Sequence, residues 1–393
     1  DMGKHVRIIG ILLLALFFCP AMAQKKIAFA EGVDEQKEIK LSEVASGVKY
    51  IPLETTAESL LDKDILNVTF AGDYLFVCDF VNLFQFTPEG KFIRKIGKAG
   101  EGPGEYAKSI LAVTYDEDAK QIFISDFRKG KVLVYSFEGK YLYDINTQRG
   151  SMTTYRDKTG NLFGITNEYL YTKDKRGKEL FVYNTKGKEL YSYHFRPEQG
   201  VRYPGIIFSY GILYDYQENT YYKNPLETTI FRLEGKKRIP AYKLDLSQYE
   251  KLSGEDDAII AIDKKTNTGT NLPNKAAEKK FSFFNVFEIT HAIGVEYAQG
   301  QGRCLAWYDK GKETVCRVRS PKAEWDGFTD DMEGGCPIFP RFVKNNKMIG
   351  VVSASVLLEK VKPENAKGSL KDLLTNLRED DNQVIQVILL KDK

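Results

Sequence analysis

The sequence predicts an all-β fold, a six-bladed β-propeller, from a tandem repeat and a recurring turn. Residues 65–146 contain one unit twice, since residues 75–80 (LFVCDF) match residues 122–127 (IFISDF). Each copy has four short runs of alternating apolar and polar residues separated by turn residues, the pattern of a four-stranded blade. A Gly-Lys turn recurs with its glycines at positions 90, 139, 187, 235 and 311, in steps of 49, 48, 48 and 76 residues. The long last step predicts an insertion in one repeat.

The two ends of the chain each carry a strand pattern without a hairpin partner, at residues 48–53 and 383–391. We expect these strands to pair in one blade, because their pairing closes the ring and removes two exposed sheet edges.

The remaining blades are less regular in sequence. We expect the third to sixth at about residues 152–195, 205–246, 281–319 and from 337 onward. Residues 247–280 form the insertion, in which residues 256–262 are expected to make a helical turn. One short helix interrupts the last blade, with Ser369 as its N-cap and an apolar stripe that packs on the propeller. The stripe consists of Leu370, Leu373, Leu374 and Leu377.

The N-terminal region predicts export. Residues 1–23 have the pattern of a signal peptide, with an apolar run at 8–18 too short to span a bilayer and a small-x-small cleavage site at 21–23. Cys19 leaves lipidation as an alternative, although Phe18 is not the small residue that a lipobox requires. Residues 24–47 are expected to be a loosely held polar leader, and residues 48–393 the propeller. We expect a periplasmic or extracellular monomer without a membrane span in its mature form.

Charge and cysteine usage exclude several classes of function. Lysine and arginine number 57 against 54 acidic residues, a net charge of +3 that does not suggest nucleic-acid binding. The cysteines beyond the signal segment are Cys78, Cys304, Cys316 and Cys336. Cys304 and Cys316 flank a Gly-Lys turn, so we expect them to be cross-strand neighbours, either as a disulfide or as buried free thiols. The spacing of the cysteines and histidines gives no zinc site.

The most distinctive stretch comprises residues 92–97 (FIRKIG) and 100–106 (GEGPGEY). A strand that ends in Arg-x-Ile-Gly and continues into Gly-x-Gly-Pro-Gly-Glu-Tyr resembles the secreted six-bladed β-propellers of gut-type Gram-negative bacteria, which are related to NHL-repeat and TolB-like propellers. The resemblance implies a fold and a compartment, and no particular activity. The sequence departs from the NHL pattern at residues 80–82 and in the insertion at 247–280.

The glycine-rich stretch also suggests a site. Residues 97–109 cross from the fourth strand of one blade to the first strand of the next, so they share a face with the turns at 79–82 and 126–131. Glu101, Glu105 and Tyr106 either help to line a pocket at the channel mouth or lock one blade to the next. We expect Gly102 or Gly104 to adopt a positive φ. The stretch lacks the Gly-Lys-Ser/Thr of a phosphate-binding loop.

Asp79 and Asp126 hold equivalent positions at the ends of second strands. One interpretation is that their carboxylates cap the turns that follow. The other is a contact to a ligand or to calcium, since carboxylates from different blades can converge on the axis.

Arginine and aromatic residues in the loops of this face suit sugars or acidic glycans. They are Arg128, Lys129, Tyr155, Arg196, Arg202, Tyr203, Trp325 and Arg341. No nucleophile motif or histidine base can be read from the sequence. We therefore expect a non-catalytic propeller that binds a carbohydrate or a protein partner through this face, without a cofactor. The alternative is a lyase or hydrolase with a carboxylate and arginine site at the channel mouth, assisted by calcium.

Overall fold

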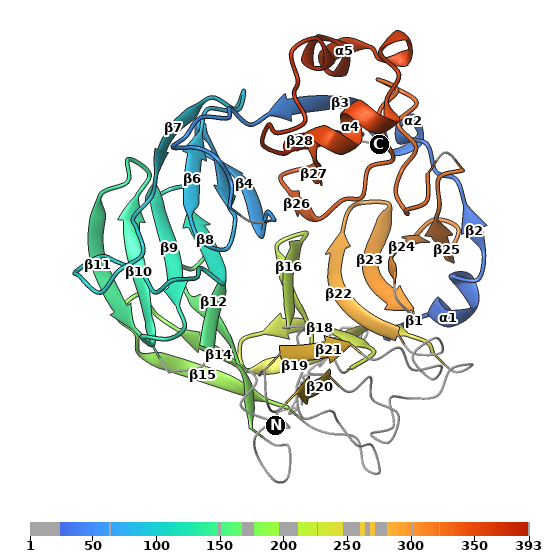
Figure 1. Cartoon of the computed structure of the whole chain (residues 1–393). Helices are drawn as coiled ribbons and strands as arrows, with labels where there is room; N and C mark the ends of the chain where they lie inside the picture. Colours follow the sequence, from blue (N-terminus) through green and yellow to red (C-terminus); the bar gives the residue numbers. More distant parts are fainter. Residues whose placement is uncertain are drawn as a thin grey trace, which may run out of the picture.

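The computed structural model has six small sheets arranged as blades around a central axis, which confirms the predicted six-bladed β-propeller (Figure 1). The structure describes residues 24–62, 64–147, 151–166, 177–195, 211–225, 227–246, 260–263, 268–271, 281–299, 302–321 and 323–391. Within these ranges, no helix is long and apolar enough to cross a membrane.

The tandem repeat folds as the first two blades. Their strands are β4 (Asn67–Ala71), β5 (Tyr74–Cys78), β6 (Leu83–Phe86) and β7 (Phe92–Lys95), then β8 (Ala112–Asp116), β9 (Gln121–Asp126), β10 (Lys131–Ser136) and β11 (Tyr141–Asn146). Successive side chains of a strand point to opposite faces. In β5, Leu75 and Val77 therefore pack in the core shared with the last blade, whereas Phe76 and Cys78 pack in the core shared with the second blade.

The next three blades follow in chain order around the ring. Their strands are β12 (Ser151–Arg156), β13 (Leu162–Thr166), β14 (Lys178–Tyr183) and β15 (Glu189–His194), then β16 (Ile212–Tyr216), β17 (Asn219–Lys223), β18 (Thr229–Glu234) and β19 (Lys237–Leu244), then β22 (Phe281–Glu288), β23 (Ala292–Gln299), β24 (Gly302–Asp309) and β25 (Thr314–Val318). The described part of the insertion is a hairpin of β20 (Ile260–Asp263) and β21 (Thr268–Asn271). A helical turn extending to residue 262 is therefore wrong, because residues 260–262 are strand.

The last blade closes the ring as predicted. Its strands are β26 (Phe342–Lys344), β27 (Lys347–Val352), β28 (Val384–Leu390) and β3 (Ala45–Pro52). Strand β3 is the outermost and runs antiparallel to β28, from Val384 opposite Pro52 to Leu390 opposite Ala45. Residues 45–52 and 384–390, which are far apart in the sequence, thus share one sheet.

Residues 24–44, which we call the strap, are not the loosely held leader that the sequence suggested. The strap contains β1 (Lys25–Ile27), α1 (Phe29–Gly32), β2 (Gln36–Lys37) and α2 (Leu41–Val44). β1 adds in parallel to the outer strand of the fourth blade, and β2 to that of the fifth. Phe29 is 1% exposed and meets Phe283 and Tyr297 edge-on. The strap therefore covers the outer edges of the fourth and fifth blades, and the chain then continues into β3 of the last blade.

A helical segment interrupts the last blade between β27 and β28. It contains α4 (Ala354–Lys360), the 3-10 turn η2 (Pro363–Asn365) and α5 (Gly368–Leu374), so there are two short α-helices where one was expected. The leucine stripe packs on the propeller as predicted. Ser369, however, is not the N-cap: it lies inside α5, and Glu333 from another loop binds the first N–H groups of the helix.

None of the four described cysteines forms a disulfide. The register places Trp307, not Cys304, opposite Cys316, so the expected cross-strand pair is wrong. Burial raises the pKa of Cys78 to about 12 and those of Cys316 and Cys336 to about 11, which keeps these thiols protonated and unreactive near neutral pH.

Candidate binding site

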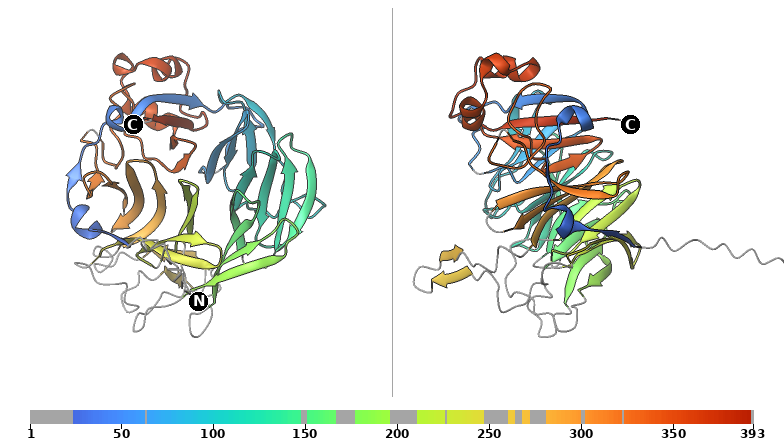
Figure 2. Two further views of the ribbon diagram at one scale, coloured as in Figure 1. Left: turned by 180° about the vertical axis from the view of Figure 1, so that it is seen from behind. Right: turned by 90° about the vertical axis from the view of Figure 1, so that its right-hand side faces the viewer.

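We call the face formed by the blade-to-blade crossings and by the turns between second and third strands the loop face. Figure 2 (right) shows α4 and α5 projecting from this side of the ring. Residues 97–109, the turns at 79–82 and 126–131, and the crossing at 319–341 belong to the same face by topology.

The carboxylate of Asp79 caps its own turn and clamps the crossing that precedes its blade. One oxygen accepts hydrogen bonds from the backbone N–H groups of Val81 (3.0 Å) and Asn82 (2.7 Å), and the other from that of Asp62 (2.8 Å). Asp126 repeats the arrangement one blade later: its carboxylate accepts from the N–H of Lys129 in its own turn (3.0 Å) and from the N–H of Ala107 in the preceding crossing (2.8 Å). Both aspartates are buried, so their carboxylate oxygens act as acceptors for backbone N–H groups. Among the described residues, no group of three or more His, Cys, Asp or Glu side chains could hold a metal ion.

The glycine-rich crossing is fixed by its own charged side chains. Gly104 has the expected positive φ, at 74°. The ammonium of Lys129 donates to the carbonyls of Gly100 (2.8 Å) and Glu105 (3.2 Å), and the N–H of Gly102 donates to the Glu105 carboxylate (2.8 Å). This backbone hydrogen bond and the nearby Lys98 lower the pKa of Glu105. Glu101 and Glu105 line a small pocket of about 180 Å³ here, but its charges are already satisfied within the protein.

The other expected site residues differ in their accessibility. Tyr106 is 1% exposed in the core between the first two blades, so a ligand cannot touch it in this structure. Arg128 is exposed on the loop face, next to Phe127. Arg202 and Tyr203 lie outside the described residues.

A much larger cavity opens elsewhere on the loop face. We call it the Trp325 crevice; its volume is about 980 Å³. One wall is the crossing from β25 to β26, and the other is the helical segment of the last blade. Its lining comprises Pro321, Ala323, Glu324, Trp325, Asp330, Asp331, Gly334, Gly335, Cys336, Pro337, Lys360, Lys362, Glu364, Asn365 and Lys367.

Trp325 is half-buried, and the indole N–H donates to the carbonyl of Pro337 at 3.2 Å. The next residue, Asp326, anchors this part of the wall to the fifth blade. Its carboxylate receives a forked pair of hydrogen bonds from Arg317, a third from Arg319 (3.2 Å) and a fourth from the N–H of Leu305 (3.0 Å). The pKa of Arg317 is raised by its hydrogen bonds to Asp326. Trp325 is therefore held from both sides.

Asp330 organises the glycine turn that follows. One oxygen accepts from two backbone N–H groups of its own turn, at 3.0 and 2.9 Å. The other accepts from the N–H of Gly335 (2.9 Å) and from the buried hydroxyl of Tyr50 on β3 (2.6 Å). Gly334 has φ 83°, and a Cβ on it would overlap the carbonyl oxygen of Asn365. Only glycine lets the two walls approach this closely.

Glu333 joins the two walls directly. Its carboxylate accepts from the Ser369 hydroxyl (2.7 Å) and from the Leu370 N–H (2.8 Å), and its carbonyl accepts from the Lys367 N–H (2.9 Å). An acidic side chain at the start of α5 is also favourable for the exposed N–H groups of the helix. The crevice is thus built from segments that are separate in sequence but fastened to each other.

The chemistry that the crevice offers is recognition by hydrogen bonds and stacking. Its rim carries three lysines against three exposed carboxylates, so neither sign dominates. The lysines are Lys360, Lys362 and Lys367, and the carboxylates are Glu324, Asp331 and Glu364. Among the described residues that line it there is no histidine, the Asp330 carboxylate is saturated with donors, and Cys336 is a buried protonated thiol. The lining residues therefore contain no nucleophile paired with a base.

Sequence reasoning named Trp325 but missed the residues that build its surroundings. The signal was the run at residues 330–337 (DDMEGGCP), in which acidic residues adjoin two glycines and a proline. Such a run indicates a tight, side-chain-bonded turn. Nothing local reveals that Tyr50 and Ser369 are its partners.

The comparisons with known proteins agree with this architecture. The family described as "Domain of unknown function (DUF4934)" matches residues 24–388. The structure of a Bacteroides fragilis protein described as exported (BF0058) is 19% identical, covers 94% of this chain and 100% of its own, and has a TM-score of 0.70. Among curated proteins, none matches.

Two further solved structures are more distant. A member of the DUF4221 family from Bacteroides vulgatus is 11% identical, covers 88% of this chain and 97% of its own, and has a TM-score of 0.48. A streptogramin B lyase is 12% identical, covers 77% of this chain and 80% of its own, and has a TM-score of 0.42. Identities this low support an inference about the fold alone, and only for the Bacteroides fragilis protein is the likeness sufficient for it.

Proposed function

The chain belongs to the DUF4934 family, and we propose that it is an exported, non-catalytic propeller that binds a neutral oligosaccharide in the Trp325 crevice. The observation that carries this proposal is the half-buried indole of Trp325, held in place on the wall of a large, polar crevice.

The Trp325 indole offers a surface on which a sugar ring can stack. A sugar ring has an apolar face of C–H groups, which packs on the face of an aromatic ring, and its hydroxyls need partners around the edge. An aromatic side chain whose orientation is fixed in advance loses little conformational entropy on binding. The hydrogen bond to Pro337 and the anchoring of Asp326 supply that fixed orientation.

The rim charges also bear on the choice of ligand. Hydroxyl groups both donate and accept hydrogen bonds, so they suit a rim with ammonium and carboxylate groups in equal number. An acidic glycan or a nucleic acid would instead favour a basic rim. Of the two partner classes expected from the sequence, the balanced rim therefore favours a carbohydrate, and a neutral one in particular.

Export and the absence of catalysis complete the proposal. The signal-peptide pattern of residues 1–23 supports a location in the periplasm or outside the cell, and the similar Bacteroides fragilis protein is described as exported. Membership of a wider NHL-like and TolB-like group, with the propeller as residues 48–393, belongs to the same proposal. The protein acts as a monomer, and binding requires no calcium or other cofactor.

An array of neutral and acidic oligosaccharides tests this function. We expect neutral glycans to bind with or without a chelator, and Trp325→Ala to weaken binding by about 2 kcal/mol or more, as for a central aromatic contact. Phe127→Ala is the matched control, since Phe127 is an aromatic of the same face that is 37% exposed and outside the crevice. Binding that survives Trp325→Ala, or that is confined to acidic glycans, would contradict the proposal.

A further inference from the structure

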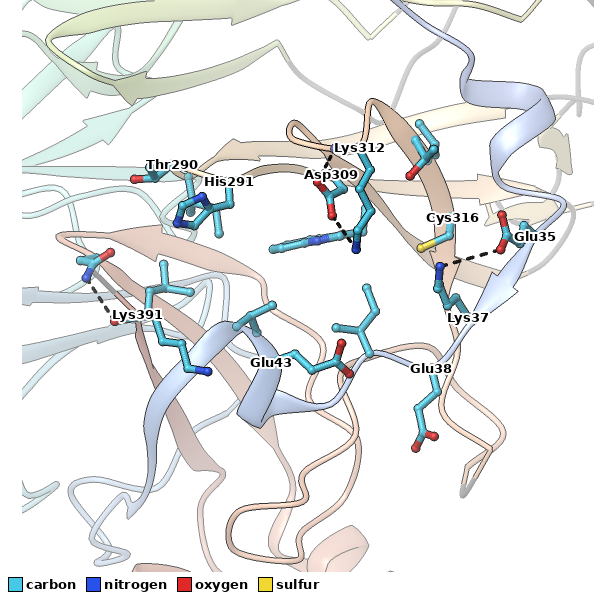
Figure 3. Close-up of a pocket in the computed structure, with 18 residues that line it drawn as sticks. Glu35, Lys37, Glu38, Glu43, Thr290, His291, Asp309, Lys312, Cys316 and Lys391 are labelled. Carbon is cyan, nitrogen blue, oxygen red and sulfur yellow. Dashed lines mark hydrogen bonds and ion pairs between the residues drawn. The ribbon is translucent and has the colours of Figure 1, made fainter. Parts of the chain in front are cut away.

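A second cavity lies on the opposite face of the ring, between the fifth and sixth blades, and we call it the strap pocket. Its volume is about 310 Å³. The walls are strap residues 35–44, the turns at 289–291 and 309–312, and the end of the chain at 390–391. Figure 3 shows these elements surrounding an open space. The pocket is separate from the Trp325 crevice, because the two have no lining residue in common.

The floor of the strap pocket is apolar and rigid. Trp307 is only 6% exposed, and its ring meets that of Phe328 edge-on, with centroids 5.1 Å apart. The strap adds Ile39 and Val44, and the chain end adds Leu390. A flat indole supported from below by other aromatic rings is suited to receive a large apolar side chain.

The rim of the strap pocket carries an imidazole and charged groups of both signs in different places. His291 and Lys391 lie on one side, Lys37 and Glu38 lie on the other, and Glu43 lies between them (Figure 3). The Lys391 ammonium donates to the carbonyl of Ser42 at 2.6 Å, which leaves further N–H donors for a ligand.

Several of these groups are available, and Glu43 uses one carboxylate oxygen to accept a hydrogen bond from the Lys40 N–H at 2.9 Å. The ion pairs on the rim are Lys312 with Asp309 at 3.3 Å and Lys37 with Glu35 at 3.9 Å, and all four side chains are at least one-third exposed. Within the described part of the chain, no hydrogen bond or ion pair engages the Glu38 carboxylate or the His291 imidazole. The two exposed ion pairs, Lys312 with Asp309 and Lys37 with Glu35, are weak and easily exchanged for contacts to a ligand.

We propose that the strap pocket binds a short peptide with free ends and a large apolar side chain. The side chain lies on Trp307, the peptide carboxylate meets Lys391 and His291, and the peptide ammonium meets Glu43 and the exposed side chain of Glu38, which turns toward the pocket on binding. The volume corresponds to roughly ten water molecules, near the lower limit for ligand cavities, so it admits one or two residues. The inference does not depend on the carbohydrate proposal, since the site is on the other face.

A small peptide fits this lining better than a sugar or a fatty acid does. A sugar would place hydroxyls over the apolar floor, where they would lack partners. A fatty acid has no cationic group for the carboxylates of Glu38 and Glu43. A zwitterion with an apolar side chain satisfies the floor and both signs of charge at once.

The two tryptophans of the chain allow the test, because Trp307 lies in one cavity and Trp325 in the other. In the Trp325→Phe protein, Trp307 is the sole indole fluorophore. The probe is the dipeptide Leu-Phe, compared with its acetylated, amidated form, which has the same side chains and no charged ends. We expect a saturable change in Trp307 emission with the free dipeptide. The blocked form should bind with an affinity lower by roughly tenfold or more.

Single substitutions locate the two ends of the peptide. We expect Lys391→Met and Glu38→Gln each to weaken dipeptide binding by roughly tenfold, the effect of losing a hydrogen bond to a charged group. Lys186→Met, at an exposed turn of the third blade, is the matched control and should bind as before. Calorimetry on the unsubstituted protein gives an answer that does not depend on Trp325→Phe. Equal binding of the blocked dipeptide, or no binding of the free one, would overturn the proposal.

Discussion

Arg317 and Asp326 form a forked ion pair beneath the wall of the Trp325 crevice. The Nε of Arg317 lies 2.8 Å from one carboxylate oxygen of Asp326, and its Nη2 lies 3.0 Å from the other. Asp326 is 1% exposed, so the pair is largely removed from solvent. Because Asp326 directly follows Trp325, this pair ties the position of the indole to the frame of the fifth blade.

The first prediction concerns this pair. Asp326→Asn removes the charge that Arg317 and Arg319 share, and breaking a buried pair typically costs on the order of 3–5 kcal/mol. Urea unfolding measures the change. Glu218→Gln, which breaks an exposed ion pair with Lys158, is the control and should leave the unfolding curve in place. Equal midpoints for the two variants would show that the Asp326 pair does not hold the wall.

The second prediction separates backbone strain from close approach. Gly235 and Gly334 both have positive φ, at 55° and 83°, but a Cβ on Gly235 meets nothing within 4 Å. We expect Gly235→Ala to lower the free energy of unfolding by about 1–2 kcal/mol, the left-handed strain alone. Gly334→Ala should lower it further, because its Cβ also overlaps Asn365. If thermal or urea unfolding shows similar losses of stability for the two variants, the walls of the Trp325 crevice can move apart at little cost.

The third prediction concerns the strap. Phe29→Ala leaves a hole among the rings of Phe283 and Tyr297, and the expected loss is about 3–5 kcal/mol, as for other buried phenylalanines. Glu31→Ala, at an exposed position of the same short helix, is the matched control and should change stability little. A loosely held leader would instead give two indistinguishable unfolding curves.

The blades could be predicted from the sequence, whereas the strap and the Trp325 crevice could not. The blades are visible in sequence because strand alternation and glycine turns are local signals. The strap escapes because its elements are two to four residues long, too short for a periodic pattern, and are stabilised by blades far along the chain. The crevice depends on contacts such as Tyr50 to Asp330, 280 positions apart. Its residues become a site only when the ring has closed.

The fourth prediction concerns Tyr106, which was expected either to line a ligand pocket or to lock one blade to the next, and which lies in the core between the first two blades. Its hydroxyl is buried and has no hydrogen-bond partner among the described residues. Tyr106→Phe should leave stability unchanged or raise it by up to about 1 kcal/mol, since a buried hydroxyl without a partner costs about 1–3 kcal/mol. Tyr106→Ala should lower it by about 3–5 kcal/mol. A Tyr106→Phe protein that folds normally but no longer binds glycan would restore Tyr106 as a site residue.

The fifth prediction is a pH dependence from Lys223. This side chain is fully buried, with its ammonium 2.7 Å from the carbonyl of Glu227, and burial lowers its pKa to about 7. The unfolded chain has the ordinary pKa of 10.5, so between about pH 7 and 10.5 it binds more protons than the folded chain. Stability should therefore rise with pH in this window, by at most about 1.4 kcal/mol per pH unit.

Unfolding curves at pH 7.5 and 8.5 test this prediction, before tyrosines titrate. Lys223→Met shifts the overall stability, because it also removes hydrogen bonds, so the slope with pH is the diagnostic quantity. We expect the slope of the variant to be smaller than that of the unsubstituted protein. Parallel slopes would mean that Lys223 keeps its ordinary pKa in the fold.

The most direct test of the proposed function is a titration of the two single-tryptophan proteins with the neutral oligosaccharide that binds best on the array. In Trp307→Phe, the emission comes from Trp325 in the crevice; in Trp325→Phe, it comes from Trp307 in the strap pocket. We expect a saturable change in Trp325 emission and none in Trp307 emission. A response from Trp307 alone, or none from either tryptophan, would contradict the assignment of the crevice as the carbohydrate site.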